Sequence, residues 1–133
     1  GQGPKEAMIP EFNIEKEFKL PWPPSVNMAY RSVGGRVIRS QKGREFADAC
    51  KEIFKDEKCI YPDEKVFFMI ELFPPTRRKF DVDNYGKVVI DTIPWFTDDS
   101  QIEALVIVKG EKDENKEGYC IVSIGKLADG KAI

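Results

Sequence analysis

The sequence contains no histidine. Without an imidazole it excludes His-ligated zinc hydrolases, histidine general bases and the Ser-His-Asp triad. Its three cysteines, Cys50, Cys59 and Cys120, stand at unrelated spacings, so we expect core or incidental residues and no disulfide framework. No apolar run approaches 18 residues, which excludes a transmembrane helix. The groups that remain for catalysis are carboxylates, lysines and a hard metal ion.

The composition is that of one ordinary globular domain. The chain has 133 residues, of which 41% are apolar, 33% are charged and 11% are aromatic. A typical domain has about 150 residues, and a chain of this length supports one hydrophobic core. The sequence shows no secretory pattern and no disulfide framework, so the expected compartment is intracellular.

Charge is segregated along the chain although the net charge is only −2. Between residues 26 and 44 there is no acid, while five basic residues occur there: Arg31, Arg36, Arg39, Lys42 and Arg44. A second basic run, Arg77-Arg78-Lys79, directly precedes a group of carboxylates. Basic segments of this kind are typical of surfaces that bind the phosphates of nucleic acids.

Hydrophobic periodicity and turn residues predict alternating strands and helices. We expect strands at 17–20, 65–73, 102–109 and 119–126, and helices at 41–55 and 82–92. Gly34-Gly35 indicates a hairpin or loop, and the charged segment 111–118 indicates a turn. The fold class is therefore α+β, a single domain with a mixed β-sheet packed with two helices in the order β-α-β-α-β-β. We assign residues 1–16 to an N-terminal extension or cloning remnant, 17–127 to the domain and 128–133 to a C-terminal tail.

Individual residues allow more specific predictions for two of these elements. Ser40 is expected to cap the helix at 41–55, whose apolar stripe consists of Phe46, Ala49, Cys50, Ile53 and Phe54. The segment 65–73 is almost wholly apolar, which is typical of a central strand buried on both faces. Pro74-Pro75 ends that strand.

Carboxylates are concentrated around the second predicted helix. If residues 82–92 are helical, Asp83, Lys87 and Asp91 recur at i, i+4 and i+8 and share one face. Asp81 stands at the helix start, and Asp98-Asp99 precedes the next strand. These acids could converge on one point.

Spacing alone leaves two interpretations of these acids open. In the structural one, Asp81 is an N-cap, Asp83, Lys87 and Asp91 form a solvated ion-pair face, and Asp98-Asp99 is a turn. In the functional one, the acids bind Mg²⁺ or Mn²⁺ through oxygen ligands. The neighbouring basic run 77–79 favours the second interpretation, because carboxylates beside cations are typical of proteins that act on phosphates.

Three motifs together resemble one family. Leu20-Pro21-Trp22-Pro23-Pro24-Ser25-Val26-Asn27, Asp81-Val82-Asp83-Asn84 with Lys87 and Asp91, and Asp98-Asp99-Ser100-Gln101-Ile102 occur in the order and approximate spacing of RusA-type Holliday junction resolvases. The resemblance spans residues 18–127. One departure is Phe80, which occupies the last position of a basic run that is commonly longer.

The resemblance implies a RusA-like fold and a homodimeric, Mg²⁺-dependent endodeoxyribonuclease that cuts four-way DNA junctions symmetrically in recombination and repair. Mn²⁺ is expected to substitute for Mg²⁺, and the expected setting is the cytoplasm of a bacterial host, with the protein encoded by a phage or prophage. The implied catalytic residues are Asp81, Asp83, Lys87 and Asp99. The implied metal ligands are Asp81, Asp83 and Asp99, with Asp91 and Asp98 as further candidates. The expected DNA-binding residues are Arg31, Arg36, Arg39, Lys42, Arg44, Arg77, Arg78 and Lys79.

Other functions remain open on these grounds. One is a nuclease for other branched phage DNA, and another is a DNA-binding phage protein that keeps the fold without catalysis. A third is an interaction domain whose acids are incidental. Trp22 is expected to be a structural anchor or a stacking surface for a base, and Asn27 and Tyr30 either line the site or form a turn.

Overall fold

The computed structural model describes residues 12–127. In chain order the elements are β1 (Lys16–Pro21), α1 (Val26–Ala29), β2 (Tyr30–Val33), β3 (Arg36–Arg39), α2 (Gln41–Ile53), β4 (Val66–Phe73), η1 (Val82–Asn84), α3 (Gly86–Ile90), η2 (Asp99–Gln101), β5 (Ile102–Lys109) and β6 (Tyr119–Lys126). The predicted C-terminal tail and most of the predicted N-terminal extension lie outside the described residues. The last residues of that extension contact the domain: Phe12 pairs with Leu127, and the Tyr61 hydroxyl donates to Glu15 Oε1 at 2.8 Å.

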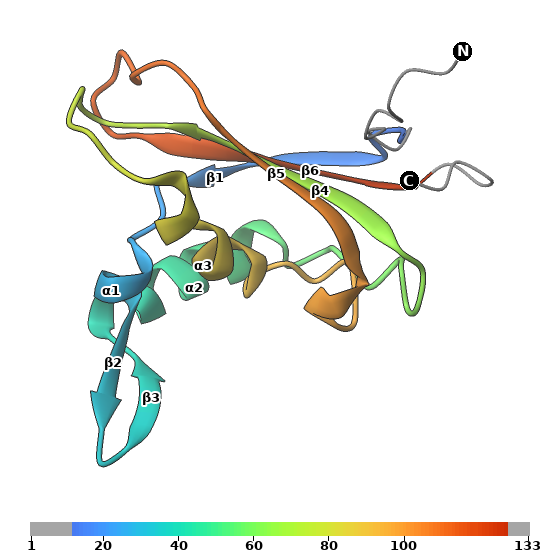
Figure 1. Ribbon diagram of the computed structural model, residues 1–133, viewed down its shortest axis with the longest axis horizontal. Coiled ribbons are helices and arrows are strands. Elements are labelled where there is room, and N and C mark those ends of the chain that lie inside the picture. The colour runs from blue at the N-terminus through green and yellow to red at the C-terminus, as the bar shows by residue number, and fades with distance from the viewer. Residues whose placement is uncertain (1–11, 128–133) are drawn as a thin grey trace, which may run out of the picture.

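A four-stranded mixed sheet in the order β1-β6-β4-β5 forms the main layer. β4 pairs antiparallel with β6 and parallel with β5, and β1 is antiparallel to β6. The helices cover one face of this sheet (Figure 1). The predicted α+β class and the four predicted strands are confirmed. The predicted order lacked α1, and it did not count the β2–β3 hairpin, which the sequence indicated as a hairpin or loop at Gly34-Gly35. The charged turn after β5 crosses the end of β4 to reach β6, so β5 and β6 are not neighbours.

β4 is the central strand, as predicted, but only its helix-facing side is completely buried. Val66, Phe68, Ile70 and Leu72 are fully enclosed, with exposed fractions of 0%. Residues 69, 71 and 73 on the opposite face are half-buried, because none of the helices in residues 12–127 covers that side of the sheet. The prediction of burial on both faces was therefore wrong for residues 69, 71 and 73, while Phe67 on the same side is 2% exposed beneath Phe12.

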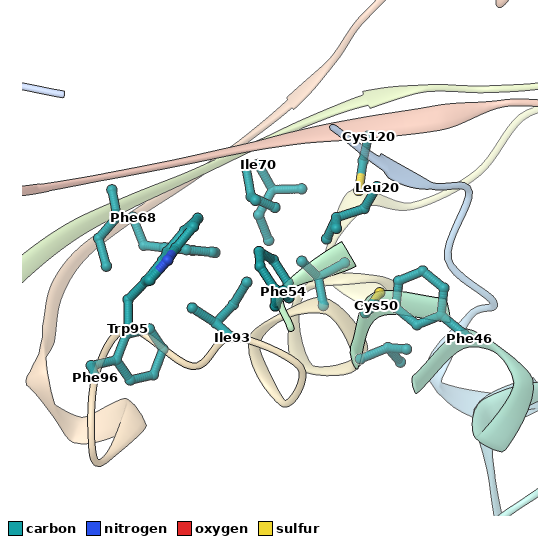
Figure 2. Close-up of a cluster of buried hydrophobic side chains, with 14 of the residues drawn as sticks. Leu20, Phe46, Cys50, Phe54, Phe68, Ile70, Ile93, Trp95, Phe96 and Cys120 are labelled. Carbon is teal, nitrogen blue, oxygen red and sulfur yellow. The ribbon is translucent and has the colours of Figure 1, made fainter. Parts of the chain in front are cut away.

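The hydrophobic core lies between the sheet and α2 (Figure 2). Phe46 and Cys50 of α2, with Phe54 directly after that helix, point toward Leu20, Ile70 and Cys120 of the sheet. Trp95 and Phe96 fill the other end of the core. Two members of the predicted α2 stripe, Ala49 and Ile53, are instead exposed. The i, i+4 row through 46, 50 and 54 already fills the narrow strip that a helix presents to a sheet.

The hairpin β2–β3 extends away from the main sheet (Figure 1). Gly34 and Gly35 connect its strands with φ values of 56° and 78°, a left-handed conformation that favours glycine and suits a two-residue turn. Ser40 Oγ accepts the Gly43 N–H at 3.1 Å, which confirms the predicted cap of α2. Among residues 12–127 the longest helix, α2, has 13 residues, and none combines the length and apolar character needed to cross a membrane.

Candidate active site

An aromatic cluster attaches the Asp81–Asp83 segment to the proline-rich end of β1. Trp22 lies 5.5 Å from the ring centroid of Phe80 and 5.2 Å from that of Tyr85, and Phe80 and Tyr85 are 5.5 Å apart. Edge-on and tilted pairs at these distances are favourable aromatic arrangements. The first two sequence motifs therefore meet in space, and Trp22 is a structural anchor.

The predicted continuous helix at 82–92 is not present. Val82–Asn84 form a 3₁₀ turn, η1, and Gly86–Ile90 form one short α-helix, α3. Tyr85 separates them with φ −117°, and glycine at 86 is a poor helix former. Glycine also lets α3 pack closely on β5, because a Cβ at residue 86 would lie 2.9 Å from Ile107 Cδ1, at the end of that side chain. Asp83 consequently does not share a helical face with Lys87 and Asp91.

Lys87 and Asp91 keep their predicted i, i+4 relation. Lys87 Nζ lies 3.3 Å from Asp91 Oδ2, and the Tyr30 hydroxyl donates to the same oxygen. Burial and the adjacent Asp91 raise the pKa of Tyr30 to about 12. Asp91 thus connects the base of the hairpin to the lysine, and its carboxylate already has two partners.

Asp98 and Gln101 shape the turn before β5. The Ser100 N–H donates to Asp98 Oδ1 at 2.8 Å and holds the pKa of that carboxyl below its usual value. Gln101 Oε1 accepts the Thr97 and Asp98 N–H groups, and its Nε2 donates to the carbonyls of Tyr61 and Glu64. These bonds fasten η2 to the segment before β4 and leave Asp99 exposed at the surface.

The two acidic turns lie at different ends of β5. η2 leads directly into Ile102, whereas Gly86 of α3 packs on Ile107 in the second half of the strand. At roughly 3.3 Å per residue, Ile102 and Ile107 are about 16 Å apart. In Figure 1 both turns lie on the helix side of the sheet, and the turn before β5 is at the start of that strand, away from α3.

The predicted convergence of all the acids does not occur within one chain. Asp81, Asp83 and Asp99 are exposed. Among residues 12–127, no three His, Cys, Asp or Glu side chains form a group able to hold a metal ion. One chain therefore offers the Asp81–Asp83 pair and, at a distance, Asp99.

A groove of about 710 Å³ runs between the hairpin and α3. Its lining includes the predicted DNA-binding residues Arg31 and Arg39 together with Lys87, and both Asn27 and Tyr30. The other basic residues of this region, Arg36, Lys42 and Arg44, do not line it. Asn27 and Tyr30 therefore line the groove beside Lys87.

A second groove of about 320 Å³ is partly lined by residues that precede η1 in the chain, up to Phe80. It is lined by the predicted residues Arg77, Arg78 and Lys79, and also by Lys109 and Lys112. Sequence reasoning missed these two lysines, because they stand at the edge of a mixed-charge turn. The one signal in the sequence was that two lysines, Lys109 and Lys112, stand close together at the end of an apolar segment.

Comparison with known proteins agrees with these motifs. Residues 21–122 match the sequence profile of a family described as endodeoxyribonuclease RusA. This chain belongs to the RusA family. The crossover junction endodeoxyribonuclease RusA of Escherichia coli strain K12 is 35% identical over 94 residues, covering 68% of this chain and 78% of that protein. The enzyme of the same name from Enterobacteria phage HK97 is 28% identical over 102 residues, covering 74% and 85%. That of Enterobacteria phage 82 is 35% identical over 94 residues.

Membership of the RusA family confirms the predicted resemblance and makes this protein an endodeoxyribonuclease. A nuclease of this kind uses a divalent metal cofactor. The donor chemistry fits, because exposed Asp81 and Asp83 supply the oxygen ligands that hard cations prefer. The pair alone provides fewer carboxylates than the predicted set of three.

Proposed function

We propose that this RusA-family protein resolves four-way DNA junctions by symmetric phosphodiester hydrolysis. The observation that carries the proposal is that residues on both sides of the Asp81–Asp83 turn line basic grooves: Phe80, directly before it, lines one, and Lys87, shortly after it, lines the other. Exposed carboxylates beside cations suit a phosphate substrate, and the relatives named above are crossover junction endodeoxyribonucleases.

The separation of Asp99 from Asp81 and Asp83 supports a homodimer. β5 is an edge strand of eight residues whose Leu105, Val106 and Val108 are 44%, 36% and 40% exposed. Such an apolar edge is suited to pairing with another strand. Antiparallel pairing of two β5 strands about a two-fold axis near Ala104 and Leu105 would set Ile102 of the second copy opposite Ile107. Asp99 of that copy would then lie near Asp81 and Asp83.

The metal site of this dimer would consist of Asp81 and Asp83 from one copy and Asp99 from the other. Three carboxylates suit Mg²⁺, with Mn²⁺ as a substitute. When bound, the ion activates water and stabilises charge on the phosphate. Asp91 and Asp98 have other partners, a lysine with a tyrosine and a backbone N–H, so their proposed role is to support neighbouring groups.

Lys87 would stabilise negative charge on the scissile phosphate or the leaving oxygen. Its ion pair with Asp91 limits its motion and keeps its ammonium group at the groove between the hairpin and α3. The remaining basic residues would bind the DNA backbone: Arg31, Arg36, Arg39, Lys42, Arg44, Arg77, Arg78 and Lys79. We place this activity in DNA recombination and repair in the cytoplasm of a bacterial host, since two relatives are phage proteins.

Cleavage of a synthetic four-way junction tests the proposal. With Mg²⁺ we expect paired symmetric nicks in the junction and none in a linear duplex of the same sequence. Asp83→Asn should abolish cleavage and retain junction binding, because it removes a charged ligand without touching the basic grooves. Metal-dependent cutting of flaps or forks in place of junctions would show that the substrate is another kind of branched DNA. Tight junction binding without any cutting would instead indicate a non-catalytic DNA-binding protein.

A further inference from the structure

We propose that Lys109 and Lys112, on the loop that follows β5, bind DNA phosphates together with Arg77–Lys79. This inference rests on the proposed junction-cutting function and extends its DNA path past the Asp81–Asp83 turn. The groove lined by these five cations is called the β5-loop groove below. It shares no lining residue with the groove that contains Lys87, and it includes Phe80, which directly precedes the turn.

The β5-loop groove combines cations from two distant parts of the sequence. Arg77, Arg78 and Lys79 come from the loop after β4, whereas Lys109 ends β5 and Lys112 follows it. The two loops meet because β4 and β5 are parallel neighbours, so that their carboxyl ends lie at the same edge of the sheet. Five positive charges are thus gathered around one hollow of about 320 Å³.

These charges have no carboxylate partners in the part of the chain that the structure describes. None of the five cations forms a salt bridge with residues 12–127. Glu111 is exposed and does not line the groove. Asp113 is occupied by the Asn115 and Gly118 N–H groups. A concentration of unpaired like charge is unfavourable by itself, and a polyanion would relieve it.

Lys109 also lies close to the residue that leads into the Asp81–Asp83 turn. Its Nζ lies 4.8 Å from the ring centroid of Phe80, within the range of a cation–π contact. Phe80 directly precedes Asp81 and is held by Trp22 and Tyr85. The ring therefore places a positive charge next to the acidic turn, at the position where the basic run 77–79 is interrupted by an aromatic residue.

The backbone holds the groove in place before any ligand binds. The Gly110 N–H donates to the Leu72 carbonyl at 2.7 Å, and the Asp113 N–H donates to the Pro74 carbonyl at 2.7 Å. Gly110 also packs so tightly on Phe73 that a Cβ would come within 2.5 Å of its ring. Both loops are consequently fixed relative to each other, so binding would require little reorganisation.

The salt dependence of junction binding tests this assignment. We would measure binding without metal, so that no cleavage occurs, for the wild type and for Lys109→Gln/Lys112→Gln over a series of salt concentrations. Each phosphate contact contributes about 0.9 to the slope of log K against log salt, so the double variant should have a slope lower by roughly 1.8. Lys55→Gln/Lys58→Gln, with the same charge change at exposed positions outside both grooves, should retain the wild-type slope.

An unchanged slope in the Lys109→Gln/Lys112→Gln variant would overturn the inference, as would equal losses in the two double variants. If the wild type cuts junctions and the Lys109→Gln/Lys112→Gln variant binds them as the wild type does, the proposed function stands. Only the assignment of the β5-loop groove to DNA binding is then rejected. A wild type that neither binds nor cuts junctions would reject the proposed function itself.

The Phe80→Leu variant tests whether the aromatic ring positions Lys109, or whether Lys109 acts only through the attraction of its charge to phosphate. Leucine keeps apolar contact with Trp22 and removes the aromatic face that holds Lys109. The slope change caused by Lys109→Gln should therefore be smaller in the Phe80→Leu protein than in the wild type. The same slope change in both backgrounds would show that Phe80 has no positioning role.

Discussion

The carboxylates of this protein differ in what their oxygens already contact. Asp91 accepts from Tyr30 and pairs with Lys87, and Asp98 accepts a backbone N–H. Both of these aspartates are exposed, as are Asp81, Asp83 and Asp99, but no salt bridge joins Asp81 or Asp83 to another of residues 12–127. A carboxylate with its hydrogen-bonding capacity in use is suited to orienting neighbours, whereas one without such partners can bind a cation. This distinction between supporting and candidate metal-binding acids operates at the scale of single residues.

The Tyr30–Asp91 contact predicts a specific loss of stability at high pH. Burial first, and then Asp91, raises the pKa of Tyr30 from 10.0 to about 12. The folded state therefore holds the phenol proton more tightly than the unfolded state. This contribution to stability is complete below pH 10 and is lost as the pH rises through about 12.

Chemical denaturation at several alkaline pH values checks this prediction. The unfolding free energy of the wild type should fall more steeply between pH 10 and 12 than that of Tyr30→Phe, which has no proton to lose. Tyr61, whose pKa burial also raises, titrates in both proteins and does not affect the difference. Parallel pH profiles for the two proteins would contradict the assignment.

Two short contacts between elements determine where the hairpin leaves the domain. The Ser40 N–H donates to the Ala29 carbonyl at 2.8 Å, and a Cβ on Gly43 would lie only 2.2 Å from that carbonyl oxygen. α1 and α2 can therefore approach closely because residue 43 has no side chain. The hairpin carries Arg31 and Arg39, so this element contact also positions one wall of the groove beside Lys87.

Gly43→Ala should destabilise the protein although alanine is the better helix former. Propensity alone favours alanine by about 1 kcal/mol. The clash with the Ala29 backbone should outweigh this gain, and we expect the unfolding free energy to fall by roughly 1–3 kcal/mol. Ala49→Gly, at an exposed position of α2, should cost about 1 kcal/mol from propensity alone. A stabilised Gly43→Ala protein, measured by urea denaturation, would contradict the close contact.

At the scale of the whole molecule, the proposed dimer joins acids that one chain keeps apart. A two-fold pairing through β5 gives two equivalent sites, each with carboxylates from both copies. Two sites related by a two-fold axis also match the two strands that a junction resolvase cuts.

Mixed dimers test whether the sites are shared. Asp83→Asn and Asp99→Asn homodimers should both be inactive. A mixed dimer contains one Asp83→Asn copy and one Asp99→Asn copy. One shared site then carries both substitutions. The other site is intact, because it takes Asp81 and Asp83 from the Asp99→Asn copy and Asp99 from the Asp83→Asn copy. We therefore expect differently tagged, co-expressed and purified mixed dimers to nick one strand of a junction without the paired cut. Inactive mixed dimers that remain folded and dimeric would show that each site belongs to a single chain.

The local structure could be predicted wherever neighbouring residues determine it. Ser40 caps α2 because its hydroxyl reaches a nearby N–H, and residues 102–109 and 119–126 form strands because their apolar residues are β-formers. The helix at 82–92 was predicted wrongly, because the segment is divided at Tyr85 into a 3₁₀ turn and a short α-helix, a division that its apolar periodicity does not reveal. The β5-loop groove was missed for a related reason: the strand pairing that joins its two loops is a long-range contact.

The sequence by itself determined the family, the nuclease chemistry and the residue types available for it, because three motifs and the absence of histidine are properties of the chain alone. Only the tertiary structure decided which of those residues meet. The parallel pairing of β4 with β5 puts Asp81 and Asp99 at different ends of one strand, and it brings Lys109 over Phe80. Contacts between residues far apart in the chain depend on how the strands pair, and local residue preferences do not specify that pairing.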